Sequence, residues 1–101
     1  MSGRVFVVGT GMTKFEKPGR RENWNFPDMV KESVTAALAD AGLNYSEIQT
    51  VFASFVQAPT CSGQRAVYEV GLTGVPVINV NNACASGSTG LYLARQAVAS
   101  G

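Results

Sequence analysis

The sequence contains no histidine, and this absence narrows the chemistry that the chain can perform. Without an imidazole it has no histidine base and no histidine metal ligand. Its two cysteines are too few for a disulfide framework, which favours a reducing compartment. No run of about 18 apolar residues occurs, so we expect no membrane span. The first residues lack an apolar stretch long enough for a secretory signal.

The sequence also lacks an excess of basic over acidic residues or the reverse. Eight basic residues face seven acidic ones, which gives no overall electrostatic case for nucleic acid or an anionic membrane as partner. No His-x-Glu, no Cys-x-x-Cys and no carboxylate cluster is present, so we expect no metal. The 101 residues allow one small domain, and an apolar content of 46% is ordinary for a globular core.

Apolar runs alternate with segments of helical periodicity, which predicts an α/β fold. The predicted strands are residues 5–8, 50–56 and 75–80. The predicted helices lie between a cap at Asn25 and a stop at Gly42, over residues 64–70 and over residues 86–100. The order β-α-β-α-β-α indicates a mostly parallel sheet with helices on its faces. On the last helix we expect an inward face formed by Gly87, Leu91, Ala94 and Val98, with Tyr92 and Arg95 turned away.

A three-stranded open parallel sheet leaves two bare edges. We therefore interpret residues 1–101 as part of a larger fold rather than a self-sufficient domain.

Cys84 is the residue with the most evident chemistry. It follows the predicted strand 75–80 across a short polar turn and precedes a helix. The N–H groups at a helix N-terminus carry partial positive charge, which favours a thiolate over a thiol. The backbone N–H of Cys84 is a candidate oxyanion donor. The small residues that let a substrate carbonyl approach are Ala83, Ala85, Ser86 and Gly87. The alternative is a buried structural cysteine, which the flanking Asn81 and Asn82 disfavour.

Three segments of the chain resemble the thiolase superfamily, and in particular the sterol-carrier-protein-x type of 3-oxoacyl-CoA thiolase. They are Arg-Val-Phe-Val-Val-Gly-Thr-Gly-Met-Thr-Lys-Phe (4–15), Thr-Cys-Ser-Gly-Gln-Arg-Ala-Val-Tyr (60–68) and Ile-Asn-Val-Asn-Asn-Ala-Cys (78–84). The resemblance implies the first part of the N-terminal thiolase half. It also implies that Cys84 accepts an acyl group from a long or branched 3-oxoacyl-CoA.

By the same resemblance, coenzyme A is the co-substrate, no cofactor is bound, and the products are an acyl-CoA with acetyl- or propionyl-CoA. It further implies a homodimer in which residues 75–80 meet a neighbour, and a peroxisomal location, with cytoplasm or mitochondrion as alternatives. The family's two catalytic histidines and its second cysteine have no counterpart here, since Cys61 lies upstream of the nucleophile. We therefore expect the chain alone to be inactive.

Two other functions stay open at this stage. One is a non-catalytic thiolase-like protein that acts in subunit association or lipid binding. The other is a condensing enzyme of the ketoacyl-synthase type, which the Asn-Asn-Ala-Cys turn fits less well.

Overall fold

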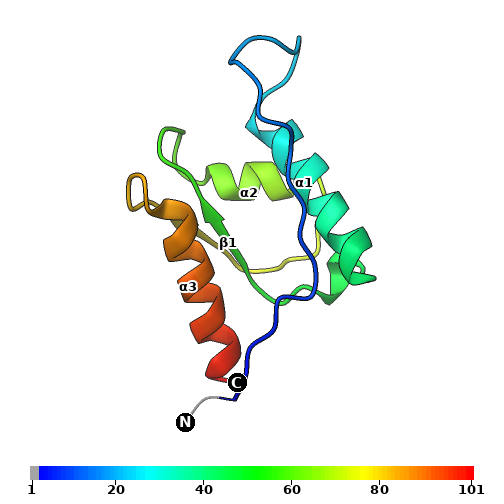
Figure 1. The fold of residues 1–101 in the computed structure, drawn as a ribbon, viewed down its shortest axis with the longest axis vertical. Helices are drawn as coiled ribbons and strands as arrows, with labels where there is room; N and C mark the ends of the chain where they lie inside the picture. The colour runs from blue at the N-terminus through cyan, green and yellow to red at the C-terminus, as the bar shows by residue number, and fades with distance from the viewer. Residues whose placement is uncertain (1–2) are drawn as a thin grey trace.

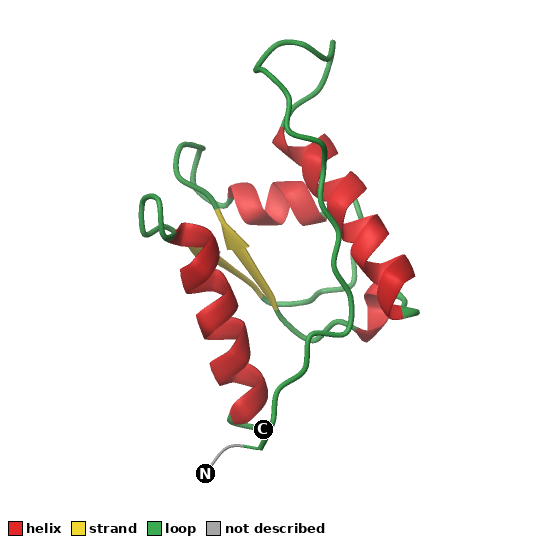
Figure 2. Ribbon diagram, in the orientation of Figure 1, coloured by secondary structure: helices red, strands yellow, loops and turns green. Residues whose placement is uncertain are grey.

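Two short apolar strands pair in parallel at the centre of the computed structural model, which describes residues 3–101 (Figures 1 and 2). Strand β1 (Val51–Ser54) aligns with β2 (Val77–Val80), so that Val51 lies opposite Val77 and Ser54 opposite Val80. The remaining elements are α1 (Phe26–Ala41), the 3-10 helix η1 (Tyr45–Glu47), α2 (Ser62–Val67) and α3 (Ser86–Ala99). This is the predicted α/β class. The strands are shorter than the sequence pattern indicated, α2 begins two residues and ends three residues earlier, and α3 ends one residue earlier.

Helices cover both faces of this sheet. Alternate strand residues point to opposite sides, so each face presents its own set of side chains to a helix. On one face α2 approaches at Gly63, where an added Cβ would lie 2.6 Å from the Cβ of Ala53 and 3.2 Å from Val77 Cγ1. On the other face α3 approaches at Gly90, which lies against Ser54 and Phe52. The chain thus forms three layers, with α1 packed on α2 (Figure 1).

Helix α1 has strong signals at both ends, and both predictions about it are confirmed. The Asn25 side chain accepts a hydrogen bond from the N–H of Phe26 at 2.8 Å. The Asp28 carboxylate accepts one from the N–H of Asn25 at 2.9 Å. At the other end Gly42 adopts the left-handed conformation, with φ of 70°.

The predicted first strand is wrong. Residues 5–8 are extended but belong to no sheet, and Figure 2 draws them as loop. The segment that follows lies on α1 instead. A Cβ at Gly9 would come within 2.5 Å of the Ala37 carbonyl oxygen, and the Thr10 N–H donates to Asp40 at 3.0 Å. With no strand beside them, Phe6, Val7 and Val8 stay 66 to 73% exposed.

The predicted inward face of α3 is wrong at Gly87, Leu91 and Val98. Tyr92 and Arg95, which we expected to be turned away, are exposed. Leu91 and Val98 are 66% and 64% exposed, and a Cβ at Gly87 would meet open space. The buried residues of α3 are Ser86 and Gly90. Small side chains face the sheet because the helix lies too close to β1 for larger ones. The core is correspondingly small, and its buried apolar side chains are Ala66, Val67 and Val80.

Candidate functional site

Cys84 lies in the turn between β2 and α3, at the edge where both parallel strands end. It is exposed, and it immediately precedes Ala85, the N-cap residue of α3. The segment after β1 reaches the same edge, because the N–H of Phe55 donates to the carbonyl of Val80 at 3.1 Å. Ligands of open parallel sheets bind outside the carboxyl ends of the strands. The predicted nucleophile is therefore exposed and at an edge suited to ligand binding.

A buried hydroxyl holds this turn together. Ser86 is 4% exposed, and its Oγ accepts a hydrogen bond from the N–H of Asn82 at 2.8 Å. The same hydroxyl donates to the Ala83 carbonyl at 2.7 Å. Two backbone groups that precede Cys84 are thereby tied to the first residue of α3.

The side chains of both asparagines also bond within the turn. Asn81 Oδ1 accepts from the N–H of Ala83 at 3.0 Å. Asn82 Nδ2 donates to Thr89 Oγ1 at 3.0 Å, and that hydroxyl donates to the Ala85 carbonyl at 2.8 Å. Ala83 takes a left-handed backbone conformation with φ of 48°, which is uncommon for a residue with a Cβ. The turn is therefore held by neutral groups.

Three backbone donors at the start of α3 make no hydrogen bond within residues 3–101. Within residues 3–101, the N–H groups of Cys84, Gly87 and Ser88 donate to no acceptor. These groups lie at the positively polarised end of α3, where anionic atoms are favoured. Unpaired donors of this kind can bond an oxygen atom that carries negative charge.

The residues around Cys84 leave it accessible. Ala83, Ala85 and Gly87, which are small, are all exposed. Ser86, which we expected to let a carbonyl approach as well, is instead buried and acts as a hydrogen-bonding bridge. The structural roles of Asn81 and Ser86 were missed by sequence reasoning. The signal that could have found Asn81 is the tendency of asparagine to accept a bond from the N–H two residues on.

Cys61 lies in a different environment from Cys84. It is the N-cap residue of α2, in a left-handed conformation with φ of 60°, and it is exposed. Both thiols are free. Cys61 borders a shallow surface hollow with Gln64 and Arg65, and Cys84 does not line that hollow.

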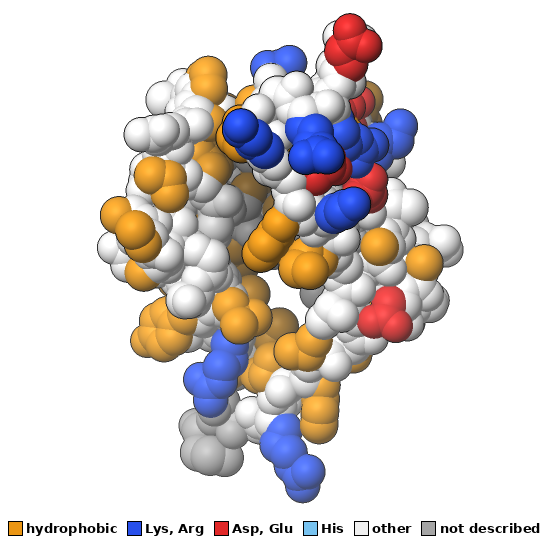
Figure 3. Space-filling view, turned by 45° about the horizontal axis from the view of Figure 1, so that its top comes forward, with side chains coloured by type: hydrophobic (Ala, Val, Ile, Leu, Met, Phe, Trp, Pro, Cys, Tyr) orange, Lys and Arg blue, Asp and Glu red, His pale blue; other side chains and the backbone are white. Residues whose placement is uncertain are grey.

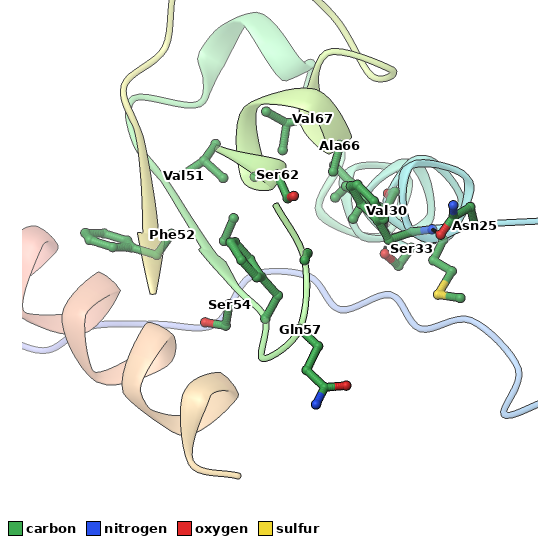
Figure 4. A pocket seen from close by; sticks show the side chains of 17 residues that line it. Asn25, Val30, Ser33, Val51, Phe52, Ser54, Gln57, Ser62, Ala66 and Val67 are labelled. Carbon is green, nitrogen blue, oxygen red and sulfur yellow. Dashed lines mark hydrogen bonds between the residues drawn. The ribbon is translucent and has the colours of Figure 1, made fainter. Parts of the chain in front are cut away.

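A separate cavity of about 420 Å³ lies between α1, β1 and α2. Figure 4 shows Val30 and Ser33 of α1 across from Val67 of α2 and Val51 of β1. Neither cysteine lines this cavity. It is therefore distinct from the turn that carries Cys84.

Charged side chains concentrate on the loop before α1. Figure 3 shows basic and acidic side chains intermixed on that part of the surface. Arg21 stacks 3.4 Å from the centre of the Trp24 ring and pairs with Glu16 at 3.6 Å and Glu32 at 3.5 Å. Arg21 thus serves to fix the loop on α1. Within residues 3–101 no three His, Cys, Asp or Glu side chains are grouped to hold a metal, and no helix is long and apolar enough to cross a membrane.

The structure thus combines a layered α/β fold with an exposed cysteine between a strand end and a helix start. The family model for the thiolase N-terminal domain matches residues 5–101, and the chain belongs to this family. The resemblance to the sterol-carrier-protein type is confirmed by curated relatives. Non-specific lipid-transfer protein-like 2 of Caenorhabditis elegans is 58% identical over 98 residues, which are 97% of this chain and 24% of that protein.

Two further relatives are less similar to this chain in sequence. Sterol carrier protein 2 of Bos taurus is 52% identical over 102 aligned residues, covering 100% of this chain and 19% of that protein. An acetyl-CoA acetyltransferase of Methanothermobacter thermautotrophicus is 32% identical, over 96% of this chain and 26% of that protein. The chain thus spans between 19% and 26% of the length of these three relatives.

Proposed function

We propose that Cys84 is the acyl-accepting nucleophile of an acyl-CoA thiolase and that this chain is the segment that carries it. The observation that supports the proposal most directly is an exposed cysteine immediately before the N-cap of α3, where the N–H groups of Cys84, Gly87 and Ser88 have no partner within residues 3–101. A thioester or ketone carbonyl attacked by the thiolate develops negative charge on its oxygen, and such donors stabilise that charge. The name of the acetyl-CoA acetyltransferase among the relatives agrees with acyl transfer to and from coenzyme A.

In the proposed reaction the Cys84 thiolate attacks the 3-keto carbon of a 3-oxoacyl-CoA. The carbonyl oxygen becomes an alkoxide, and its collapse breaks the bond between Cα and Cβ. The bonding electrons leave as the enolate of acetyl-CoA, or of propionyl-CoA from a 2-methyl-branched substrate, and the enolate takes up a proton. The acyl group stays on Cys84 as a thioester. The thiol of coenzyme A then loses its proton, attacks that thioester and restores the thiolate.

Both proton transfers need an acid or a base, and the chain has no histidine. We therefore propose that these groups come from outside residues 1–101 and that the chain alone has negligible thiolytic turnover. Acyl transfer to the thiol is the part of the reaction that its own residues support. Transfer from acetyl-CoA forms a thioester on Cys84 and releases the coenzyme A thiolate, so it requires no carbon–carbon cleavage.

The test is mass spectrometry of the purified chain after exposure to acetyl-CoA. Cys61 serves as an internal reference, because it is also exposed and free. We expect an acetyl adduct that forms on Cys84 faster than on Cys61 and is absent at that site in Cys84→Ala. Equal and slow labelling of both cysteines would refute the proposal and favour the non-catalytic alternative. Thiolytic cleavage by the chain alone would refute our assignment of the proton-transfer groups.

We further propose that residues 1–101 form part of a thiolase N-terminal domain and that the rest of that fold covers their exposed apolar side chains. Phe6, Leu72 and Leu91 are 70%, 80% and 66% exposed. One edge of β2 has no partner strand within residues 3–101, and Ile78 on that strand is 41% exposed. We propose that this edge meets a second copy in a homodimer, so the purified chain should self-associate. A stable monomer at high concentration in size-exclusion chromatography would contradict this. The peroxisomal location stays a prediction from the resemblance.

A further inference from the structure

The backbone conformation of Ala83 points to a device that orients the nucleophile. Its φ of 48° lies in the left-handed region, which is unfavourable for a residue with a Cβ. Such a conformation persists only where neighbouring groups hold it. Ala83 directly precedes Cys84, so its backbone angles set the direction of the peptide group that carries the Cys84 N–H.

The Asn81 side chain supplies that restraint and connects the turn to the segment after the neighbouring strand β1. Its Oδ1 accepts from the N–H of Ala83 at 3.0 Å, and its Nδ2 donates to the carbonyl of Val56 at 3.1 Å. Val56 follows Phe55, whose own N–H is bonded to Val80 at the end of β2. One amide therefore fixes the turn at one end and the segment after β1 at the other.

We infer that Asn81 is a positioning residue for Cys84. By holding Ala83 in the left-handed conformation, it keeps the thiol and the unpaired Cys84 N–H on the open side of the turn. Asn81 touches neither the thiol nor any reacting atom and acts through Ala83. The inference rests on the proposed function, since it assigns Asn81 a role in acyl transfer to Cys84.

The experiment is a double-mutant cycle between positions 81 and 83, with acetylation by acetyl-CoA as the measurement. The rate at Cys84 is divided by the rate at Cys61 in the same molecules, so that global unfolding does not imitate the effect. Asn81→Ala is expected to lower this ratio about tenfold, because the turn is released from its reactive geometry. In an A83G background the same substitution should lower it by no more than about twofold, since glycine adopts positive φ without steric cost.

Two further variants make the result specific. Asn81→Ser keeps an oxygen within reach of the Ala83 N–H and should lose less than Asn81→Ala. Gln96→Ala removes another exposed amide, which bonds the Tyr92 hydroxyl at 2.9 Å on the body of α3, and should leave the ratio unchanged. The inference is overturned if Asn81→Ala labels Cys84 as fast as the wild type, or if its loss is equally large with A83G. The comparison of these variants presupposes that the wild type acetylates Cys84 in preference to Cys61. Failure of that preference refutes the proposed function itself.

Discussion

Replacing Gly63 by alanine tests how closely α2 must approach the sheet that leads to Cys84. An added Cβ would lie 2.5 Å from Asn79 Oδ1 and 2.6 Å from the Cβ of Ala53, which is closer than real contacts allow. Overpacking of this kind costs about 1–3 kcal/mol. The shift would also strain the 2.7 Å bond from the Gly63 N–H to Asn79, worth about 1 kcal/mol. Alanine recovers about 1 kcal/mol through its higher helix propensity. We therefore expect a net loss of about 1–3 kcal/mol.

Thermal unfolding followed by circular dichroism measures this change. A loss of that size lowers the Tm of a domain of this length by about 5–20 °C. Gly87→Ala is the matched control, because it makes the same substitution in a helix where a Cβ meets nothing within 4 Å. There the helix-propensity gain is unopposed, and the variant should be more stable by about 0.5–1 kcal/mol. If Gly63→Ala raised the Tm as Gly87→Ala should, the close approach of α2 to β2 would be refuted.

Three further predictions concern single side chains. Ser86→Ala removes the acceptor of the Asn82 N–H and should cost about 1–3 kcal/mol in urea unfolding, with slower alkylation of Cys84 relative to the wild type. Asn25→Ala removes the cap of α1 and should cost about 1 kcal/mol, whereas Asn25→Ser should restore most of it. Burial, with a smaller contribution from Tyr68, raises the pKa of Tyr45 above its ordinary value of 10.0. The folded state therefore holds this proton more tightly than the unfolded state, and stability should fall as the pH rises above about 10. Tyr45→Phe should remove that part of the pH dependence, and a slope unchanged in the variant would refute the assignment.

The parts of the fold that sequence predicted well are those with signals at both ends. Asn25 and Gly42 bound α1 through local hydrogen bonds and a left-handed turn, so neighbouring residues were sufficient to find it. Residues 5–8 carry an equally apolar pattern, yet they form no strand. A strand exists only where another backbone pairs with it, and four apolar residues do not specify that partner.

The inward face of α3 was mispredicted for a related reason. Helical periodicity selected the large side chains of Leu91 and Val98, which suits a helix that meets its neighbours at ordinary distance. At Gly90 the helix lies against Ser54 and Phe52, so the smallest residues form the contact. How closely two elements approach depends on both of them, and a single segment does not contain that information.

The position of Cys84 was predictable, whereas the way its turn is held was not. A strand end, a cysteine and a run of small residues are adjacent in the sequence, and the structure places Cys84 next to the N-cap of α3. The bond from Asn81 to Val56 joins residues 25 positions apart and follows from the parallel pairing of β1 with β2. Burial of the Ser86 hydroxyl depends in the same way on α3 lying on the sheet.

The groups needed for acyl transfer are present in this segment, whereas a histidine for proton transfer is not. Its thiol comes from the turn before α3, its unpaired N–H groups come from that turn and the first residues of α3, and neutral side chains hold the turn in place. This set suits attack on a carbonyl and stabilisation of the resulting oxyanion, both of which depend on fixed dipoles. Cleavage of a carbon–carbon bond also requires proton transfer at the leaving carbon, and the chain has no histidine to provide it. Acyl transfer without cleavage is therefore the activity that we propose for residues 1–101, and testing it separates the proposed role of Cys84 from that of an acid or base.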